Sequence, residues 1–288
     1  MQQLDDAAEG PQVGAFFDLD RTLIAGYSAL AFGRDLVRSG HLHWWMLQSE
    51  LVEAANAMRK ESGDGYTAAM SVLASLLVGV REAALVEIGE SLFEKEYAGR
   101  LHPEAFELIE AHRARGHTLI VASASTAYQT HPIARALGVR DVLCTRFESF
   151  SGRLTGSIES ACWGVGKLEA ARTLAEERNI DLAESFFYSD GSEDLPLLEA
   201  VGRPRPTNPD EKLEQLASER GWPVRHFGER KAATVWELAQ PLFERRPRRN
   251  LKAEVERAFD GQIRMGYRMA QWMRRALKDS NTENSRRR

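Results

Sequence analysis

The sequence predicts an α/β fold: a doubly wound parallel-sheet core with a helical cap inserted after the first strand. Apolar runs of strand type alternate with stretches of helical periodicity, which is typical of such sheets. The runs are nearly continuous in apolar residues, as expected of parallel strands that are buried on both faces. By contrast, residues 23–100 contain helical stretches and no convincing strand, which indicates an inserted helical cap.

The expected strands are short apolar runs that stop at polar residues. The three strong runs span residues 13–17, 118–122 and 185–188, and two weaker runs span residues 142–145 and 224–227. The expected helices lie between and before them. Pro103 begins a stretch that ends before Gly116, and both residues are usual at these helix boundaries. The remaining helical stretches are residues 27–38, 41–58, 66–80, 82–97, 127–137, 166–178 and 193–200.

This pattern divides the chain into three parts. Residues 13–22 and 101–228 form the expected core, residues 23–100 the cap, and residues 229–288 a basic C-terminal helical extension. The composition, 43% hydrophobic and 28% charged, is that of a globular protein and excludes a disordered or fibrous chain. Two cysteines without C-x-x-C spacing exclude a disulfide framework and a zinc or redox pair, so we expect a cytoplasmic location.

Acidic and hydroxyl side chains follow the three strong strands. Asp18-Leu-Asp-Arg-Thr22 follows the first strand, Ser123 ends the second, and residues 189–194 follow the third. Because ligands of open α/β sheets bind outside the carboxyl ends of the strands, these side chains are expected to converge there. Taken singly, the Asp18–Asp20 pair is equally consistent with a solvated loop, and the serines with a helix N-cap.

A lysine adds to this group. Lys167 opens a helical stretch, where the helix dipole disfavours a cation unless an anion lies nearby. A solvated surface lysine remains the alternative. Two acidic strand ends, one hydroxyl strand end and a lysine in this order are together better explained by one functional site than by chance.

These residues resemble the four motifs of the haloacid dehalogenase superfamily: Asp18-x-Asp-x-Thr22, Ser123, Lys167 and Ser189-Asp-Gly-Ser-Glu-Asp194. The helical insertion after the first motif is similar to the cap of its subfamily IB, the phosphoserine-phosphatase-like members. The resemblance implies a phosphatase that uses Mg²⁺. It implies that Asp18 is the nucleophile and that Asp20 is the general acid and base. It implies that phosphate binds Thr22, Ser123 and Lys167.

The resemblance also implies a metal site. Mg²⁺ would be bound by the carboxylates of Asp18 and Asp190 and by the backbone carbonyl of Asp20, with Asp194 behind this shell. Two departures concern the substrate. The stretch 23–28 lacks the acid with which phosphoserine phosphatases meet the substrate amine, and the second motif reads Ser123-Ala-Ser. The expected substrate is therefore a small phosphorylated metabolite, with phosphoserine as one candidate.

The C-terminal extension differs in charge from the rest of the chain. The whole protein has a net charge of −4, whereas residues 244–288 hold 14 Lys and Arg against 6 Asp and Glu, a surplus of 8, so the preceding residues sum to −12. Apolar residues from Leu251 to Leu277 recur with helical spacing. We expect this helix to dock on the protein or on a second copy, or to lie on an anionic membrane surface. Nucleic-acid binding is the least favoured reading.

Three functions follow from these residues. The leading one is a Mg²⁺-dependent phosphomonoester hydrolase that acts on a small phosphorylated substrate. A neighbouring one is a phosphotransferase or a lipid-phosphate phosphatase that the tail holds at a membrane. The third is a non-catalytic phosphate-binding or scaffold protein of the same fold, which the presence of Asp18 and Asp20 disfavours.

Overall fold

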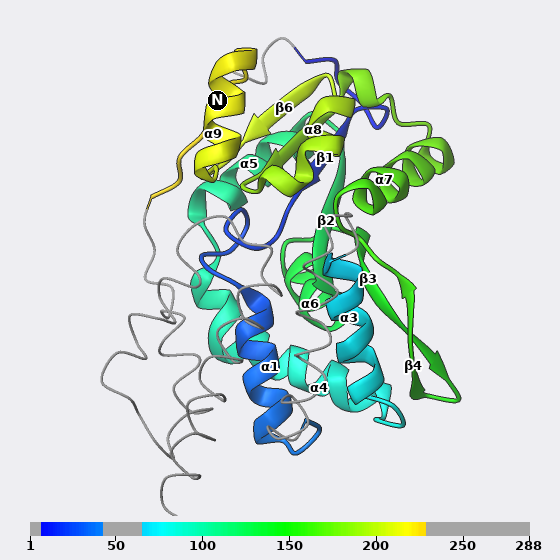
Figure 1. The fold of residues 1–288 in the computed structure, drawn as a ribbon. Coiled ribbons are helices and arrows are strands. Elements are labelled where there is room, and N and C mark those ends of the chain that lie inside the picture. The colour runs from blue at the N-terminus through cyan, green and yellow to red at the C-terminus, as the bar shows by residue number, and fades with distance from the viewer. Residues whose placement is uncertain (1–6, 43–64, 229–288) are drawn as a thin grey trace, which may run out of the picture. The chain divides into compact units, whose positions relative to one another are not determined.

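The structure is a computed structural model, and it describes residues 7–42 and 65–228. Its sheet has six strands in the order β4-β3-β2-β1-β5-β6. The strand pairs β1–β2, β1–β5, β2–β3 and β5–β6 are parallel. The predicted doubly wound parallel sheet is thereby confirmed (Figure 1). The strands span Gly14–Phe17 (β1), Thr118–Thr126 (β2), Asp141–Phe150 (β3), Arg153–Ser160 (β4), Phe186–Ser189 (β5) and Arg203–Pro206 (β6).

The helices follow the predicted alternation. Four of the described helices precede β2: α1 (Ser28–Arg38), α3 (Gly65–Leu76), α4 (Glu82–Leu92) and α5 (Pro103–Ala114). The others are α6 (Ala127–Ala136), α7 (Val165–Arg178), α8 (Leu195–Ala200) and α9 (Glu211–Arg220). After α4 the chain continues through a π-helical turn, Phe93–Tyr97, and a 3-10 turn, Ala98–Arg100. Among the described residues between β1 and α5 there is no further strand, as predicted for the inserted segment.

The chain divides into two compact units. The described part of the first unit comprises residues 7–32, 86–146 and 159–228, and it contains β1, β2, β5 and β6. The described part of the second comprises residues 33–42, 65–85 and 147–158. Within the second unit, the chain after α3 pairs with the β3–β4 hairpin, where Gly79 N donates to Leu154 O at 2.8 Å. The predicted boundaries of core, cap and extension stay a prediction.

The core of the first unit lies on both faces of the sheet. On one face, Phe16 of β1 and Phe187 of β5 pack against apolar residues of α7, α8 and α9. On the other face, Phe17 stacks on Tyr188 with ring centroids 4.9 Å apart and meets the edge of His112 from α5. Both faces of β1 are therefore covered, which explains its continuous apolar sequence.

Two expectations about strands were wrong. Residues 224–227 form only an isolated bridge, between Thr207 and Arg225, and are not a strand of the sheet. Residues 153–160 and 203–206 are strands although they were not expected. The β3–β4 connection is a two-residue turn, Ser151 and Gly152, whose φ angles of 51° and 72° match the twist of a hairpin.

Other expectations concern segments that the structure does not describe. The predicted helix at residues 41–58 lies almost wholly outside the described residues, and so does the basic extension at 229–288. Among the described helices, none combines the length and hydropathy needed to cross a bilayer.

A buried histidine links α5 to the sheet. His112 is fully buried; its Nδ1 lies 2.7 Å from His117 Nδ1, and its Nε2 lies 2.9 Å from the Tyr188 hydroxyl. Burial lowers the pKa of His112 to about 3, and the nearby His117 and arginines act in the same direction. Because the unfolded chain binds a proton near the ordinary pKa of about 6.5, acidification below that value favours unfolding.

We therefore expect His112 to destabilise the fold in mild acid. Between pH 6.5 and pH 5 it should cost about 2 kcal/mol of unfolding free energy, since each pH unit is worth about 1.4 kcal/mol for one proton. His112→Gln, which binds no proton, should lose less stability than the wild type over this range. Urea unfolding at both pH values measures the difference. Parallel pH dependences of the two proteins would contradict the assignment.

Candidate active site

The predicted site residues meet at the carboxyl ends of three strands. In the sheet, Phe17 pairs with Val121 on one side and with Tyr188 on the other. Consequently Asp18, Ser123 and Asp190, which follow these positions, lie at one edge of the sheet. Asp18 N also donates to Tyr188 O at 2.8 Å, which fixes the chain as it leaves β1. This edge is where open α/β sheets bind their ligands.

Lys167 is buried beside two of the acids. It lies in the first turn of α7 and is 2% exposed. Its Nζ donates to Asp18 Oδ1 at 2.9 Å and to Asp194 Oδ2 at 2.7 Å. Burial alone would lower the pKa of Lys167, but the carboxylates, Asp18 foremost, hold it well above its ordinary value. Lys167 therefore stays charged within the site, and the reading as a solvated surface lysine is wrong.

Asp194 holds this lysine in place. It is 3% exposed, and its Oδ2 accepts a hydrogen bond from Ser189 Oγ at 2.6 Å as well as the one from Lys167. Its Oδ1 is buried and has no hydrogen-bond partner among the described residues. Such an acceptor is costly unless a donor or a cation is supplied.

Asp18 and Asp190 are buried acids whose pKa values are both raised. Burial raises the pKa of Asp18 to about 7, although Lys167 acts in the opposite direction. Burial also raises the pKa of Asp190 well above its ordinary value, Arg21 lowers it, and Asp18 raises it further. Arg21 Nη1 lies 3.1 Å from Asp190 Oδ2. Burial is the main cause of both shifts, and repulsion from neighbouring acids adds to it.

Asp20 has a different environment from Asp18. Its Oδ1 accepts from Ser28 N at 2.7 Å, and its Oδ2 accepts from Ser125 Oγ at 2.9 Å and from Ser28 Oγ at 3.2 Å. Burial raises the pKa of Asp20, and these hydrogen bonds lower it. Two carboxylates close in sequence thus have unlike partners: a lysine for Asp18, and neutral donors for Asp20. Such a difference is typical of sites in which two acids take separate roles.

Thr22 and Ser123 complete the predicted set. Thr22 is 1% exposed, and its Oγ1 has no hydrogen-bond partner among the described residues. Ser123 is 2% exposed, and its Oγ accepts from Ser125 N at 3.1 Å, which leaves its proton free to donate. Both hydroxyls are therefore available as donors to an anion.

The donor set fits a hard divalent cation. The carboxylates of Asp18 and Asp190 offer oxygen atoms only, which Mg²⁺ prefers, and their raised pKa values indicate a need for positive charge. In the described part of the chain, no group of three or more His, Cys, Asp and Glu side chains is arranged to hold a metal. Two carboxylates suffice for Mg²⁺, because this ion usually keeps several waters and binds substrate phosphate.

A family model for haloacid dehalogenase-like hydrolases matches residues 15–199, which include all of these side chains. The chain belongs to this family. The predicted resemblance and the predicted enzyme class, a phosphatase of the haloacid dehalogenase superfamily, are thereby confirmed.

Relatives within the family carry phosphatase names. A phosphoserine phosphatase of Mycobacterium tuberculosis is 34% identical over 228 residues, which are 77% of this chain and 73% of that protein. A histidinol-phosphatase of Neisseria meningitidis serogroup C is 30% identical over 74% of this chain and 98% of its own. A solved protein of unknown function from Bordetella pertussis superposes with a TM-score of 0.65 at 30% identity, covering 74% of this chain and 98% of that one.

Sequence reasoning missed three residues at this haloacid dehalogenase-like site. Arg21 contacts Asp190, and Ser28 and Ser125 contact Asp20. The sequence offers Ser125 or Thr126 as the N-cap of the helix that follows β2, and the N-cap of α6 is Thr126, whose backbone N donates to Gln129 Oε1 at 3.1 Å. The Thr-x-x-Gln spacing of a helix start was the available signal, and it would have left Ser125 free for another role.

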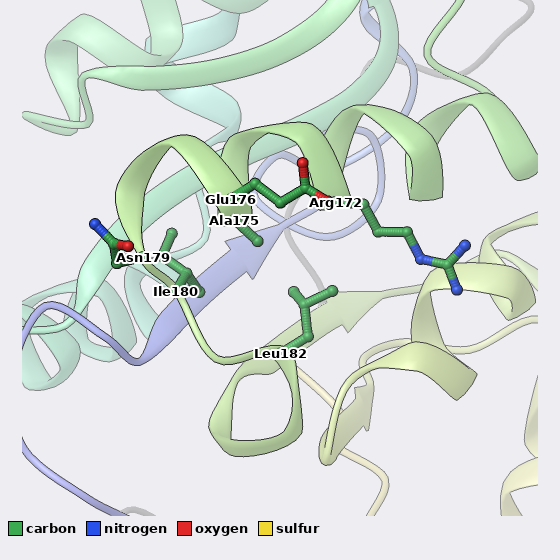
Figure 2. Close-up of a pocket in the computed structure, with 6 residues that line it drawn as sticks. All are labelled: Arg172, Ala175, Glu176, Asn179, Ile180 and Leu182. Atoms are coloured by element: carbon green, nitrogen blue, oxygen red, sulfur yellow. The ribbon is translucent and has the colours of Figure 1, made fainter.

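A shallow hollow of about 470 Å³ lies elsewhere in this hydrolase fold (Figure 2). Its residues come from the C-terminal half of α7 and the chain that follows: Arg172, Ala175, Glu176, Asn179, Ile180 and Leu182. Ile180 packs near Gly14, at the amino end of β1. The hollow is therefore at the opposite end of the strands from Asp18, and it contains none of the predicted site residues.

Proposed function

We propose that the protein is a Mg²⁺-dependent phosphomonoesterase that transfers the phosphoryl group of a small metabolite to Asp18 and then to water. The observation that carries this proposal is the buried Lys167, which contacts Asp18 and Asp194 together. A lysine ammonium has three protons, and two are used by these acids. The third can bind a phosphate oxygen beside the carboxylate that attacks.

In the first step Asp18 is the nucleophile. Its Oδ1 bonds to Lys167, so Oδ2 is the oxygen that forms the bond to phosphorus. The phosphorus–oxygen bond to the leaving group breaks at the same time, and Asp20 donates its proton to that oxygen. The alcohol leaves, and Asp18 carries the phosphoryl group as an aspartyl-phosphate.

In the second step Asp20 acts as a base. It accepts a proton from a water molecule, whose oxygen attacks phosphorus while the bond to Asp18 breaks. Inorganic phosphate is released, Asp18 is a carboxylate again, and Asp20 is protonated for the next cycle. The raised pKa of Asp20, caused by its burial, suits a group that alternates between acid and base.

Other residues of the site would hold Mg²⁺ and bind the phosphate oxygens. Asp18, Asp190 and the backbone carbonyl of Asp20 would hold Mg²⁺, which supplies positive charge against the phosphate oxygens when bound. Thr22 and Ser123 would donate to the remaining phosphate oxygens. The Thr22 hydroxyl has no partner within residues 7–42 and 65–228, which supports this role, because a buried hydroxyl costs free energy unless it is hydrogen-bonded.

The substrate class is inferred from the relatives and the site. The relatives named above are called phosphoserine phosphatase and histidinol-phosphatase, so alkyl phosphates with an amino group are the first candidates. The amine-binding acid expected of phosphoserine phosphatases is absent between Leu23 and Ser28, where Ser28 contacts Asp20 instead. We therefore propose an alkyl phosphomonoester other than phosphoserine as the better substrate. Cytoplasmic location and membrane contact through residues 229–288 stay predictions.

A panel of phosphomonoesters tests this function. With Mg²⁺, the wild type should release inorganic phosphate from at least one alkyl phosphate, and EDTA should abolish the release until Mg²⁺ is restored. Histidinol phosphate, phosphoserine, a sugar phosphate and a glycerol phosphate represent the candidate classes. Release that continues undiminished in EDTA would contradict the metal dependence, and the absence of turnover on every ester would favour a binding function.

A further inference from the structure

The site contains a feature that the proposed chemistry does not yet explain, namely the two serines around Asp20. We infer that Ser28 and Ser125 form a hydroxyl clamp that orients the Asp20 carboxylate so that Oδ1 is the atom that transfers the proton. This inference rests on the proposed role of Asp20 as general acid and base. It assigns Ser28 and Ser125 as positioning residues.

The clamp reaches Asp20 from two separate parts of the chain. Ser28 is the first residue of α1, and Ser125 lies near the end of β2. Their hydroxyl oxygens are 2.8 Å apart, and both lie within hydrogen-bond distance of Asp20 Oδ2. Ser28 also donates its backbone N–H to Oδ1. The carboxylate is thus held at both oxygens, and its plane is fixed.

The direction of the hydrogen bonds follows from Gln129. Its Oε1 accepts from Thr126 N at 3.1 Å and from Thr126 Oγ1 at 2.5 Å, so its amide nitrogen must point the other way. That nitrogen, Nε2, donates to Ser28 Oγ at 3.2 Å. Ser28 Oγ is therefore an acceptor from Gln129, and its single proton is directed to Ser125 Oγ or to Asp20 Oδ2.

The residues that support Asp20 are buried. Ser28 and Tyr97 are fully buried, Gln129 is 2% exposed and Ser125 is 6% exposed. The Tyr97 hydroxyl donates to Ser28 O at 2.8 Å, which anchors the start of α1. Asp20 itself is only partly buried. Its supports are thus sealed from water while the carboxylate keeps access to a substrate.

The two oxygens of the Asp20 carboxylate differ in their surroundings, and this difference identifies the reactive one. Each carboxylate oxygen accepts about two hydrogen bonds. Whichever partner receives the Ser28 proton, the hydroxyl oxygens of Ser28 and Ser125 lie 3.2 and 2.9 Å from Oδ2 and occupy the space around it, whereas Oδ1 accepts only from Ser28 N among the described residues. Oδ1 therefore retains an open position, and it is the oxygen from which a proton can pass to the leaving group or to which water can give one.

The clamp predicts a loss that depends on the leaving group. In Ser125→Ala, Asp20 Oδ2 loses the shorter of its two hydroxyl contacts and the carboxylate is less firmly oriented, so the first turnover of an alkyl phosphate should slow by about 10- to 100-fold, a part of what general acid catalysis supplies. The first turnover of para-nitrophenyl phosphate should stay at the wild-type rate, because nitrophenolate leaves without a proton. Water attack still needs Asp20, so a burst of nitrophenolate should precede a slow steady state.

Rapid-quench measurements of the first-turnover rate on both esters test this prediction. Ser28→Ala, which removes the other hydroxyl of the clamp, should show the same selectivity, and Ser125→Thr, which keeps a hydroxyl, should restore the rate. Thr130→Val is the matched control, since the Thr130 hydroxyl of α6 is buried and, in the part of the chain that the structure describes, bonds to Thr126 O alone. It should retain wild-type rates on both esters.

Asp20→Asn in the same assay distinguishes a failure of the clamp from a failure of the proposed acid role of Asp20. If Asp20→Asn shows the leaving-group selectivity but Ser125→Ala and Ser28→Ala slow both esters equally or neither, the clamp is wrong and the proposed function stands. If Asp20→Asn itself shows no selectivity, the acid role of Asp20 and the clamp are both overturned. Selectivity in all three variants, with recovery in Ser125→Thr, supports the clamp.

Discussion

Asp18→Asn is expected to lower turnover of every phosphomonoester by about a thousandfold or more, because the amide oxygen is too weak a nucleophile to accept the phosphoryl group. The fold should persist, since the asparagine has nearly the same shape and Lys167 keeps Asp194 as a partner. The measurement is phosphate release under saturating substrate and Mg²⁺, together with a thermal melt to verify folding.

The matched control for this change is Glu169→Gln. It also converts a carboxylate to an amide, but Glu169 is an exposed residue of α7 away from the predicted site set. Its activity should equal that of the wild type. Near-normal turnover in a folded Asp18→Asn variant would rule out Asp18 as the nucleophile.

Lys167→Met is expected to impair both stability and activity. The change leaves Asp18 and Asp194 buried without their shared cation, and breaking such a buried pair typically costs about 3–5 kcal/mol of unfolding free energy. Loss of a positive donor at the phosphate should also reduce the rate by about a hundredfold or more. Urea unfolding without metal and phosphate-release assays with Mg²⁺ measure the two effects.

Acidification should partly rescue the stability of Lys167→Met. Even with lysine present, burial raises the folded pKa of Asp18 to about 7, so the folded carboxyl binds a proton more readily than the unfolded one. Stability from this group is present at low pH and is lost as the pH rises through about 7. Lys212→Met, an exposed residue of α9, is the control and should change stability by less than about 0.5 kcal/mol. Wild-type stability in Lys167→Met would contradict the buried ion pair.

The central strands of the fold could be predicted because burial on both faces requires a continuous apolar sequence. β1 and β5 are covered on both faces, so their residues are apolar without interruption. The edge strands carry no such signal. Arg203–Pro206 alternates arginine with proline, and proline is tolerated only where a strand lies at the edge of a sheet. Arg153–Ser160 is polar and largely exposed, so its sequence does not indicate a buried strand.

Some residues of the site could likewise be predicted from the sequence, and others could not. Asp18, Asp190 and Lys167 could be predicted because strand ends and a helix start bring them together by topology alone. Ser28 and Ser125 are 97 positions apart, and their contact depends on the path of the chain between Asp20 and α1. That path includes Arg21 in a left-handed conformation with φ of 60°, which no apolar period indicates. Contacts that depend on the path of irregular loops cannot be predicted from the sequence pattern.

The most direct test of the proposed function is chemical trapping of the phosphorylated enzyme. The wild type is mixed with Mg²⁺ and para-nitrophenyl phosphate, quenched in acid within the first turnover, digested and analysed by mass spectrometry. We expect one added phosphoryl group on the peptide that contains Asp18, and its absence from Asp18→Asn. An unmodified Asp18 peptide during active turnover, or a phosphoryl group on another residue, would contradict it.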